Sequence, residues 1–174
     1  YHHTYGLNTT TSNRSNNYGA YQFPEKLIPL CLINILEGKS LPIYGDGTQI
    51  RDWLHVEDHC RGIDLVLRDG TYGETYNIGS DNEMKNIEMV KLLCNTVNAI
   101  FAQSSKLHSV FPNSPCAKGV DSKSLITFVK DRPGHDTRYA INAKKIRSEL
   151  GFTTSVSFDE GLRSTIEWYL ENQE

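Results

Sequence analysis

Three short polar stretches carry residue types that suit the binding of a phosphorylated sugar. They are Asn16-Asn17-Tyr18, Arg51-Asp52 and the run 131–135, which reads DRPGH. Two arginines can grip a diphosphate through paired N–H donors, and asparagine amides can hydrogen-bond to sugar hydroxyls. Taken together, the three stretches predict a site for an anionic, hydroxyl-rich ligand.

Each stretch also has a simpler structural explanation. Asn and Tyr in a turn commonly serve turn geometry, adjacent Arg and Asp commonly form a local ion pair, and a histidine beside glycine is commonly solvated. Only the combination favours a binding site. Asp58 and His59 are of acid/base type as well, but we interpret them as the N-cap of a helix and its neighbour.

The amino-acid composition of the chain argues against two classes of partner, nucleic acids and membranes. The chain has 174 residues, of which 38% are apolar and 22% charged, with a net charge of −3, as in ordinary globular domains. The 18 basic and 21 acidic residues form no lysine-rich block, so we expect no nucleic-acid partner. The stretch 27–36 is shorter than the ~20 apolar residues that cross a bilayer, and no secretory leader is recognised, so we expect no membrane partner.

The cysteines predict neither a metal site nor disulfides. Cys31, Cys60, Cys94 and Cys116 contain no C-x-x-C pair. We expect buried free thiols in a reducing compartment, and therefore a cytoplasmic protein. His2 and His3 would face different sides of a helix and are expected at the surface, whereas the rings of Tyr139 and Trp168 are expected in the core.

Strands that alternate with helices must position the polar stretches. Strands are predicted at 8–15, 41–44, 51–56, 74–78 and 125–129, and helices are predicted to begin near Pro24, Asp58, Asn86, Asn142 and Ser157. Residues 16–19 are predicted as a turn. This order indicates an α/β architecture, in which ligands bind beyond the carboxyl ends of strands. Residues 103–124 lack apolar periodicity and contain Pro112, Pro115 and Gly119, so we expect a mobile loop or insertion there.

Longer motifs resemble a known family over nearly the whole chain except 103–124. The strings are SNNYGAYQFPEKLIPL (Ser15 to Leu30), LPIYGDGTQIRDWLHVEDH (Leu41 to His59), GETYNIG (Gly73 to Gly79) and DRPGHDTRYAI (Asp131 to Ile141). They resemble the C-terminal half of the dTDP-glucose 4,6-dehydratases, which belong to the extended short-chain dehydrogenase/reductases. The resemblance implies the C-terminal part of a Rossmann-like fold: the last strands of the parallel sheet and a small substrate-binding α/β lobe, together spanning 1–174.

The resemblance also implies roles for individual residues. Asn16 corresponds to a residue beside the nicotinamide of NAD, and Asn17 to one that contacts the sugar diphosphate. Arg51 and Arg132 correspond to diphosphate clamps, and Asn86 to a further nucleotide contact. Two stretches correspond to segments that wrap the nucleotide, namely Lys26, Leu27, Ile28, Pro29, Leu30 and Cys31, and Pro42, Ile43 and Tyr44. Asp131, Arg132, Pro133, Gly134 and His135 correspond to a loop that closes over it.

The family's reaction needs motifs that these 174 residues do not contain. NAD takes hydride from C4 of glucose, water leaves from C5 and C6, and the hydride returns to C6. The sequence has no G-x-x-G-x-x-G loop, no Y-x-x-x-K pair and no Thr-Asp-Glu set. In family members the Tyr-Lys pair lies shortly upstream of the position of Tyr1. We therefore expect that the half that binds most of NAD and carries the catalytic residues is missing, and that the whole enzyme is a homodimer.

The sequence is compatible with two other functions. One is a related nucleotide-sugar epimerase or decarboxylase, against which the DRPGHD string argues. The other is a non-catalytic module that binds a nucleotide sugar. The choice between thymidine and uridine nucleotides also stays open, because it depends on few contacts around Tyr44 and the helix after Pro24.

Overall fold

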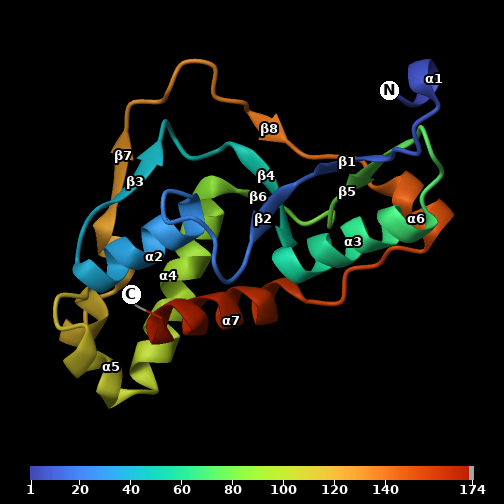
Figure 1. Cartoon of the computed structure of the whole chain (residues 1–174). Coiled ribbons are helices and arrows are strands. Elements are labelled where there is room, and N and C mark those ends of the chain that lie inside the picture. Colours follow the sequence, from blue (N-terminus) through green and yellow to red (C-terminus); the bar gives the residue numbers. More distant parts are fainter. Residues whose placement is uncertain (173–174) are drawn as a thin grey trace.

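The computed structural model describes residues 1–172. The α-helices are α1 (His2–Tyr5), α2 (Leu27–Glu37), α3 (Val56–Asp69), α4 (Asn86–Ala102), α5 (Ser105–Val110), α6 (Lys144–Leu150) and α7 (Phe158–Glu171), with 3-10 helices η1 (Pro115–Lys118) and η2 (Ser122–Leu125) (Figure 1). The strands are β1 (Thr11–Arg14), β2 (Asn16–Tyr18), β3 (Leu41–Tyr44), β4 (Ile50–His55), β5 (Thr75–Ile78), β6 (Glu83–Lys85), β7 (Ile126–Val129) and β8 (Arg138–Tyr139). The α/β prediction is confirmed.

The strands form small sheets in which most pairs are parallel. β1 pairs with β5, and β3 with β7. β4 pairs in parallel with β2 and β8 and antiparallel with β6. The register places Asn16 opposite Trp53 and Ile50 opposite Arg138. β4 is therefore the strand to which the other parts of this sheet are joined.

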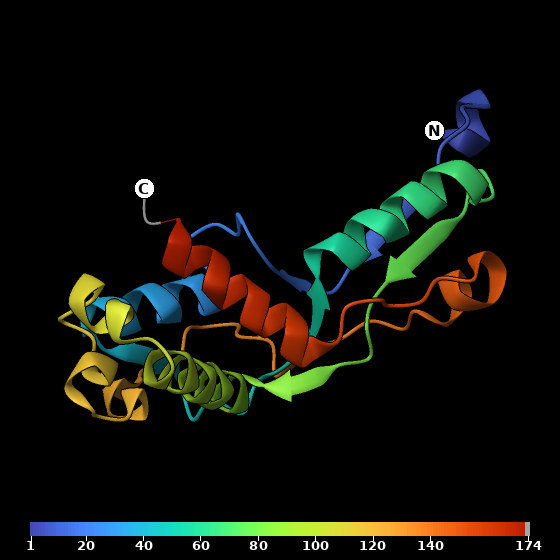
Figure 2. The same cartoon turned by 90° about the horizontal axis from the view of Figure 1, so that it is seen from below.

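Two hydrophobic cores lie beneath these elements. The larger one gathers side chains of α2, α4 and α7 with those of β3, including Leu32, Leu41, Leu93 and Ile166, each fully buried. The smaller one joins α3 and α6 to β5 through residues such as Ile78 and Ile146. Figure 2 shows the same division, with α2, α4 and α7 at one end of the molecule and α3 and α6 at the other.

The second helix begins later than the sequence suggests. Its N-cap is Lys26, in extended conformation, so Pro24 lies before the helix and not at its first position. Pro29 is the third helical residue, where the missing N–H would have no partner within the helix. The helix ends as expected at Gly38, whose φ of 70° is left-handed.

Several strand predictions need correction. The predicted strand 8–15 is shorter, and 16–18 is the strand β2 and not a turn, because pairing with β4 overrides the low strand preference of asparagine. β6 and β8 were not predicted, since three and two residues are too few to show a pattern.

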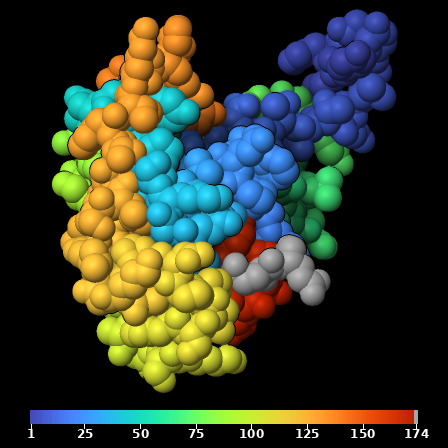
Figure 3. Space-filling model, turned by 90° about the vertical axis from the view of Figure 1, so that its left-hand side faces the viewer, coloured from blue at the N-terminus to red at the C-terminus, as the bar shows by residue number. Residues whose placement is uncertain are grey.

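The segment 103–124 contains regular structure, so the expectation of a loop without it was wrong. It carries α5, η1 and the first part of η2. Phe111 and Cys116, each 8% exposed, join the larger core, and Ser122 is fully buried. The hydroxyl of Ser122 donates to Oδ1 of Asn98 on α4 at 2.8 Å. Figure 3 shows the segment, in yellow, packed against the blue and cyan elements before it in the chain.

Asp58 connects α3 to the segment before α7. The residue is 1% exposed, and its carboxylate accepts hydrogen bonds from Arg61, from the backbone and hydroxyl of Ser155, and from the backbone of Val156. Burial would raise the pKa of Asp58, but these hydrogen bonds and the charge of Arg61 outweigh it and lower the pKa. The N-cap of α3 is His55, so our assignment of Asp58 as the cap was wrong.

We predict that Asp58→Asn lowers the free energy of unfolding by about 2–3 kcal/mol at pH 7, because charge-assisted hydrogen bonds are lost in a buried site. Urea titration measures the change. Because the folded-state pKa is depressed, the difference from wild type stays complete above about pH 4 and shrinks as the pH falls below it. Asp64→Asn is the control: Asp64 is an exposed partner of Arg68 on the same helix, and its loss costs under about 1 kcal/mol. Equal effects of the two variants would contradict the prediction.

A second prediction concerns the packing of residues 103–124. Phe111→Ala should lower the free energy of unfolding by about 3–4 kcal/mol, because it empties a site in the larger core. Val110→Ala, at the adjacent residue that is 51% exposed, should cost under about 1 kcal/mol. If thermal or urea unfolding of the two variants is indistinguishable, the segment is not a packed part of the fold.

Candidate nucleotide-sugar site

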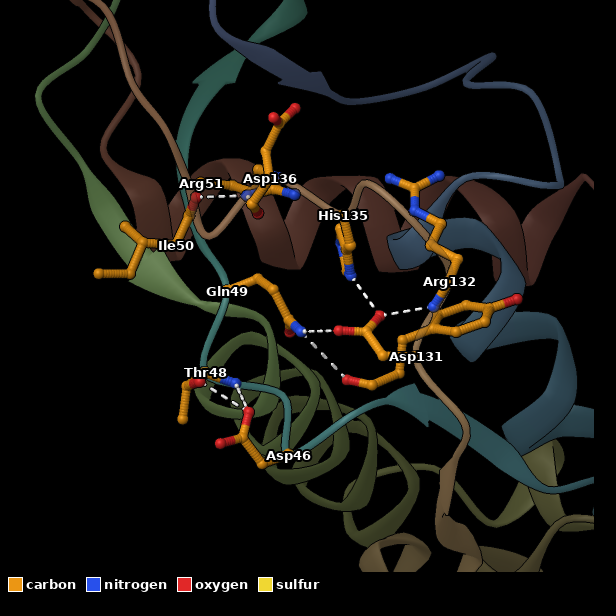
Figure 4. A network of polar contacts seen from close by, with 10 residues as sticks. Asp46, Thr48, Gln49, Ile50, Arg51, Asp131, Arg132, His135 and Asp136 are labelled. Atoms are coloured by element: carbon orange, nitrogen blue, oxygen red, sulfur yellow. Dashed lines mark hydrogen bonds and ion pairs between the residues drawn. The ribbon is translucent and has the colours of Figure 1, made fainter.

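Two loops lie side by side because two pairs of strands are joined in parallel. β3 pairs with β7 and β4 pairs with β8, so residues 45–49 run beside residues 130–137. The N–H of Gly45 donates to the carbonyl of Val129 at 2.9 Å, and the N–H of Ile50 donates to that of Thr137 at 2.8 Å. Figure 4 shows the side chains that meet between these loops. The structure thus brings two of the three predicted polar stretches together.

Arg51 is a buried cation at the start of β4. It is 8% exposed, and its Nη1 donates to the carbonyls of Ile50 at 2.7 Å and Asp136 at 3.0 Å. Within residues 1–172 it forms no ion pair. Burial lowers the pKa of Arg51, the charge of Asp136 opposes this, and the nearby charge of Arg132 lowers it further. Two guanidinium groups therefore share one region with no carboxylate bound to Arg51.

Asp52 does not pair with Arg51, so the simpler explanation of a local ion pair is wrong. Successive residues of a strand face opposite sides, and Asp52 points to the other side of β4. It is 1% exposed and accepts hydrogen bonds from the hydroxyl of Ser80 at 2.7 Å and the N–H of Asn82 at 2.8 Å. Asp52 therefore stabilises the turn after β5 and forms no ion pair with Arg51.

Asp131 organises the loop that begins with it. Its Oδ1 accepts from the N–H of Arg132 at 2.8 Å and lies 2.7 Å from Nδ1 of His135 (Figure 4). The hydrogen bond with His135 is the main reason that the pKa of Asp131 is lowered. The side chain of His135 is 6% exposed and meets the ring of Tyr44 edge-on, with centroids 6.3 Å apart. His135 is thus held by specific contacts and is not a solvated side chain, whereas Pro133 and Gly134 are exposed.

The asparagines lie on neighbouring elements. Asn16 and Asn17 are on β2 beside β4, and Nδ2 of Asn17 lies 2.5 Å from Nδ1 of His59. Asn86 begins α4, where its N–H donates to the carbonyl of Gln49 at 2.9 Å. Oδ1 of Asn17 and Oδ1 of Asn86 are both buried with no hydrogen-bond partner in the part of the chain described. These two oxygens are available to donors from a ligand.

The two stretches expected to wrap a nucleotide are divided between core and surface. Ile28, Cys31 and Ile43 are at most 2% exposed and fill the larger core. Pro29 is also buried, whereas Leu27, Leu30 and Pro42 are partly exposed. Lys26 is exposed, and Tyr44 is 48% exposed at the end of β3. Lys26 and Tyr44 are therefore the accessible polar side chains of these stretches.

Gln49 is a residue of the site that our sequence reasoning missed. It is 6% exposed, and its Nε2 donates to Oδ2 of Asp131 at 3.0 Å and to the carbonyl of Tyr44 at 3.4 Å. One signal was present in the sequence. Gln49 stands two positions before Arg51, and residues two apart along an extended chain face the same side.

Other groups that resemble reactive centres have structural roles. Tyr18, His55 and Asp58 line one cavity of about 260 Å³. The Tyr18 hydroxyl donates to the carbonyl of Phe158 at 3.5 Å, and burial raises the pKa of Tyr18. Asp58 is occupied by the hydrogen bonds described above. Burial also raises the pKa of the free Cys31 thiol to about 12.

Two features are absent from residues 1–172. No cluster of three or more His, Cys, Asp and Glu side chains is placed to hold a metal ion. No helix in these residues has the length and apolar character needed to cross a membrane.

Solved structures with this fold include dehydratases and epimerases of nucleotide sugars. A dTDP-glucose 4,6-dehydratase from Streptomyces venezuelae, with NAD and TDP bound, is 44% identical, with a TM-score of 0.84, and the match covers 99% of this chain and 47% of that one. A UDP-glucose 4-epimerase from Thermotoga maritima, with UDP-glucose, is 23% identical with a TM-score of 0.78, covering 99% and 49%, a likeness of fold alone. The chain therefore shares its α/β fold with these dehydratase and epimerase structures.

The chain belongs to the family described as GDP-mannose 4,6 dehydratase, whose model matches residues 1–165. Among curated relatives, the dTDP-glucose 4,6-dehydratase of Neisseria meningitidis serogroup B is 54% identical over 98% of this chain and 45% of the relative. That of Escherichia coli is 52% identical over 97% and 43%. The expected resemblance to dTDP-glucose 4,6-dehydratases is confirmed. The chain spans less than half the length of these relatives.

Proposed function

We propose that this chain is the nucleotide-sugar-binding, C-terminal half of a dTDP-glucose 4,6-dehydratase, a lyase that forms dTDP-4-keto-6-deoxyglucose with the help of NAD. The observation that carries the proposal is the pair of Arg51 and Arg132. Arg51 is buried without a carboxylate, and Arg132 is an exposed guanidinium near it. A diphosphate between them would offset both charges and accept paired hydrogen bonds.

The neighbouring side chains suit the rest of such a ligand. Tyr44 offers an exposed ring beside the 131–135 loop for a base. The buried acceptors of Asn17 and Asn86 suit ligand hydroxyls and other donors. Arg51 lies near the start of β4, and Asn16 on the adjacent strand β2 is opposite Trp53, two residues further along and therefore on the same face as Arg51. Pyrophosphate and sugar would therefore extend along β4 toward β2.

NAD would meet this chain mainly at Asn16. Asn16 is half-buried on β2, and its side-chain amide makes no hydrogen bond within the described residues, so it is available to a ligand. NAD, when bound, would supply hydride exchange. Because these 174 residues contain neither a G-x-x-G-x-x-G loop nor a Y-x-x-x-K pair, we assign no catalytic residue to them. The rest of NAD binding and the homodimer contact are assigned to the remainder of the longer protein.

The epimerase alternative has less support. Identities are 44–54% to the dehydratases cited above but 23% to the UDP-glucose 4-epimerase. The network around Asp131 also gives the DRPGH run a defined structural role. A non-catalytic binding module would share the same ligand site, so binding and turnover must be tested separately.

We predict that Arg51→Ala in the full-length protein weakens dTDP binding by roughly tenfold or more, because at least one charge-assisted hydrogen bond is lost. Arg51→Lys should weaken it less, since a point charge replaces a bidentate donor. Isothermal calorimetry measures both. Arg68→Ala, which removes an exposed arginine paired with Asp64, should bind like wild type. Unchanged affinity in Arg51→Ala would remove Arg51 from the site and with it the proposed function.

A second prediction concerns turnover. The 174-residue chain alone should form no 4-keto sugar from dTDP-glucose and NAD, because it contains none of the acid, base and cofactor-loop motifs that the reaction needs. The full-length protein, assayed in parallel, should form it. Product above background from the chain alone would contradict our assignment of the chemistry, and an inactive full-length protein that still binds dTDP would favour the binding module.

A further inference from the structure

We propose that Gln49 is a positioning residue that fixes the 131–135 loop and so sets the place of Arg132 opposite Arg51. The inference rests on the proposed function, because it concerns how the two arginines of that site are held. Gln49 itself need not touch a ligand. Its role would be to hold the chain segment from which Arg132 projects.

The amide of Gln49 is oriented by its two partners. Nε2 donates to Oδ2 of Asp131 at 3.0 Å and to the carbonyl of Tyr44 at 3.4 Å (Figure 4). Both partners are acceptors, so only the nitrogen of the amide can face them. With 6% of Gln49 exposed, water competes little for these bonds. The side chain therefore makes a defined link between the loop before β4 and the loop before β8.

The second carboxylate oxygen of Asp131 joins Gln49 indirectly to the rest of the 131–135 loop. While Oδ2 meets Gln49, Oδ1 accepts from the N–H of Arg132 and contacts Nδ1 of His135. One carboxylate thus holds both ends of the 131–135 loop. The backbone of Arg132 is fixed, and its guanidinium is left free of protein partners within residues 1–172.

The backbone around Gln49 is itself anchored near the other proposed ligand contacts. Its carbonyl accepts from the N–H of Asn86, and it stands two residues before Arg51 on the same side of the chain. Gly45 makes room for the link: a Cβ there would lie 3.0 Å from Oδ2 of Asp131, and its φ of +60° is left-handed. Through its backbone and its side chain, Gln49 therefore links the chain segments that carry Arg51, Asn86 and Arg132.

The test uses the full-length protein and three variants. Gln49→Met keeps much of the side-chain volume and removes the hydrogen bond without adding charge. Gln49→Glu places a carboxylate against that of Asp131, so the two groups repel. The double variant Gln49→Glu/Asp131→Asn exchanges the roles at the shorter contact: the new amide nitrogen donates to the new carboxylate, while its oxygen still accepts from Arg132 and His135. The longer contact with the Tyr44 carbonyl is not restored, because a carboxylate has no hydrogen to donate.

We expect Gln49→Met to weaken dTDP binding by about threefold to tenfold, Gln49→Glu by about tenfold or more, and the double variant to return to within about threefold of wild type. Calorimetry measures the affinities, and melting temperatures without ligand check the fold. Gln103→Glu, at an exposed position, is the control for an added charge and should bind like wild type.

The proposal is overturned if Gln49→Met binds like wild type. It is also overturned if the double variant binds no better than Gln49→Glu, or if each loss of affinity is matched by a lower melting temperature that the double variant does not restore. Arg51→Ala in the same assay separates the two ideas. If it weakens binding while the Gln49 variants do not, the proposed function stands and the positioning role fails.

Discussion

The pairing of β4 with three other strands is the constraint on which the site depends. β8 lies beside its first residues, β6 beside the same end, and β2 beside its last residues. Because β3 also pairs with β7, residues more than eighty positions apart, such as Gln49 and Asp131, are held within hydrogen-bond distance. Without these pairings, Arg51 and Arg132 would lie on separate flexible loops, and each would be an ordinary solvated cation.

The burial of the Arg51 guanidinium determines how this arrangement can interact with an anion. A guanidinium that is removed from water and bonded only to carbonyls keeps much of its desolvation cost, which an anion can offset. The carboxylates of Asp52 and Asp131 are engaged elsewhere. Asp52 holds the turn after β5, and Asp131 is bonded to Gln49, Arg132 and His135. These two acidic residues thus shape the loops and form no ion pair with Arg51, whose positive charge is opposed by that of Asp136 without an ion pair.

The sequence predicted those features that depend on local patterns. The left-handed end of α2 at Gly38 and the hydroxyl cap of α7 at Ser157 follow from residue type, and both are present. Features that depend on distant partners were missed. β2 contains two asparagines and becomes a strand only beside β4, Phe111 reaches the core from a segment without periodicity, and Gln49 acquires its role only when the 131–135 loop is placed next to it.

In the proposed site, the unpaired oxygens of Asn17 and Asn86 would favour ligands that carry a hydrogen-bond donor at the matching position. A buried acceptor without a donor is costly, and the cost disappears only if the ligand brings an O–H or N–H to it. A compound of the same shape and charge but without that O–H or N–H would leave the asparagine oxygen unpaired, so the energetic cost would remain in the complex. Discrimination between such compounds can exceed what apolar contacts provide. A compound without the donor fails to form the hydrogen bond and also leaves the asparagine oxygen buried without a partner.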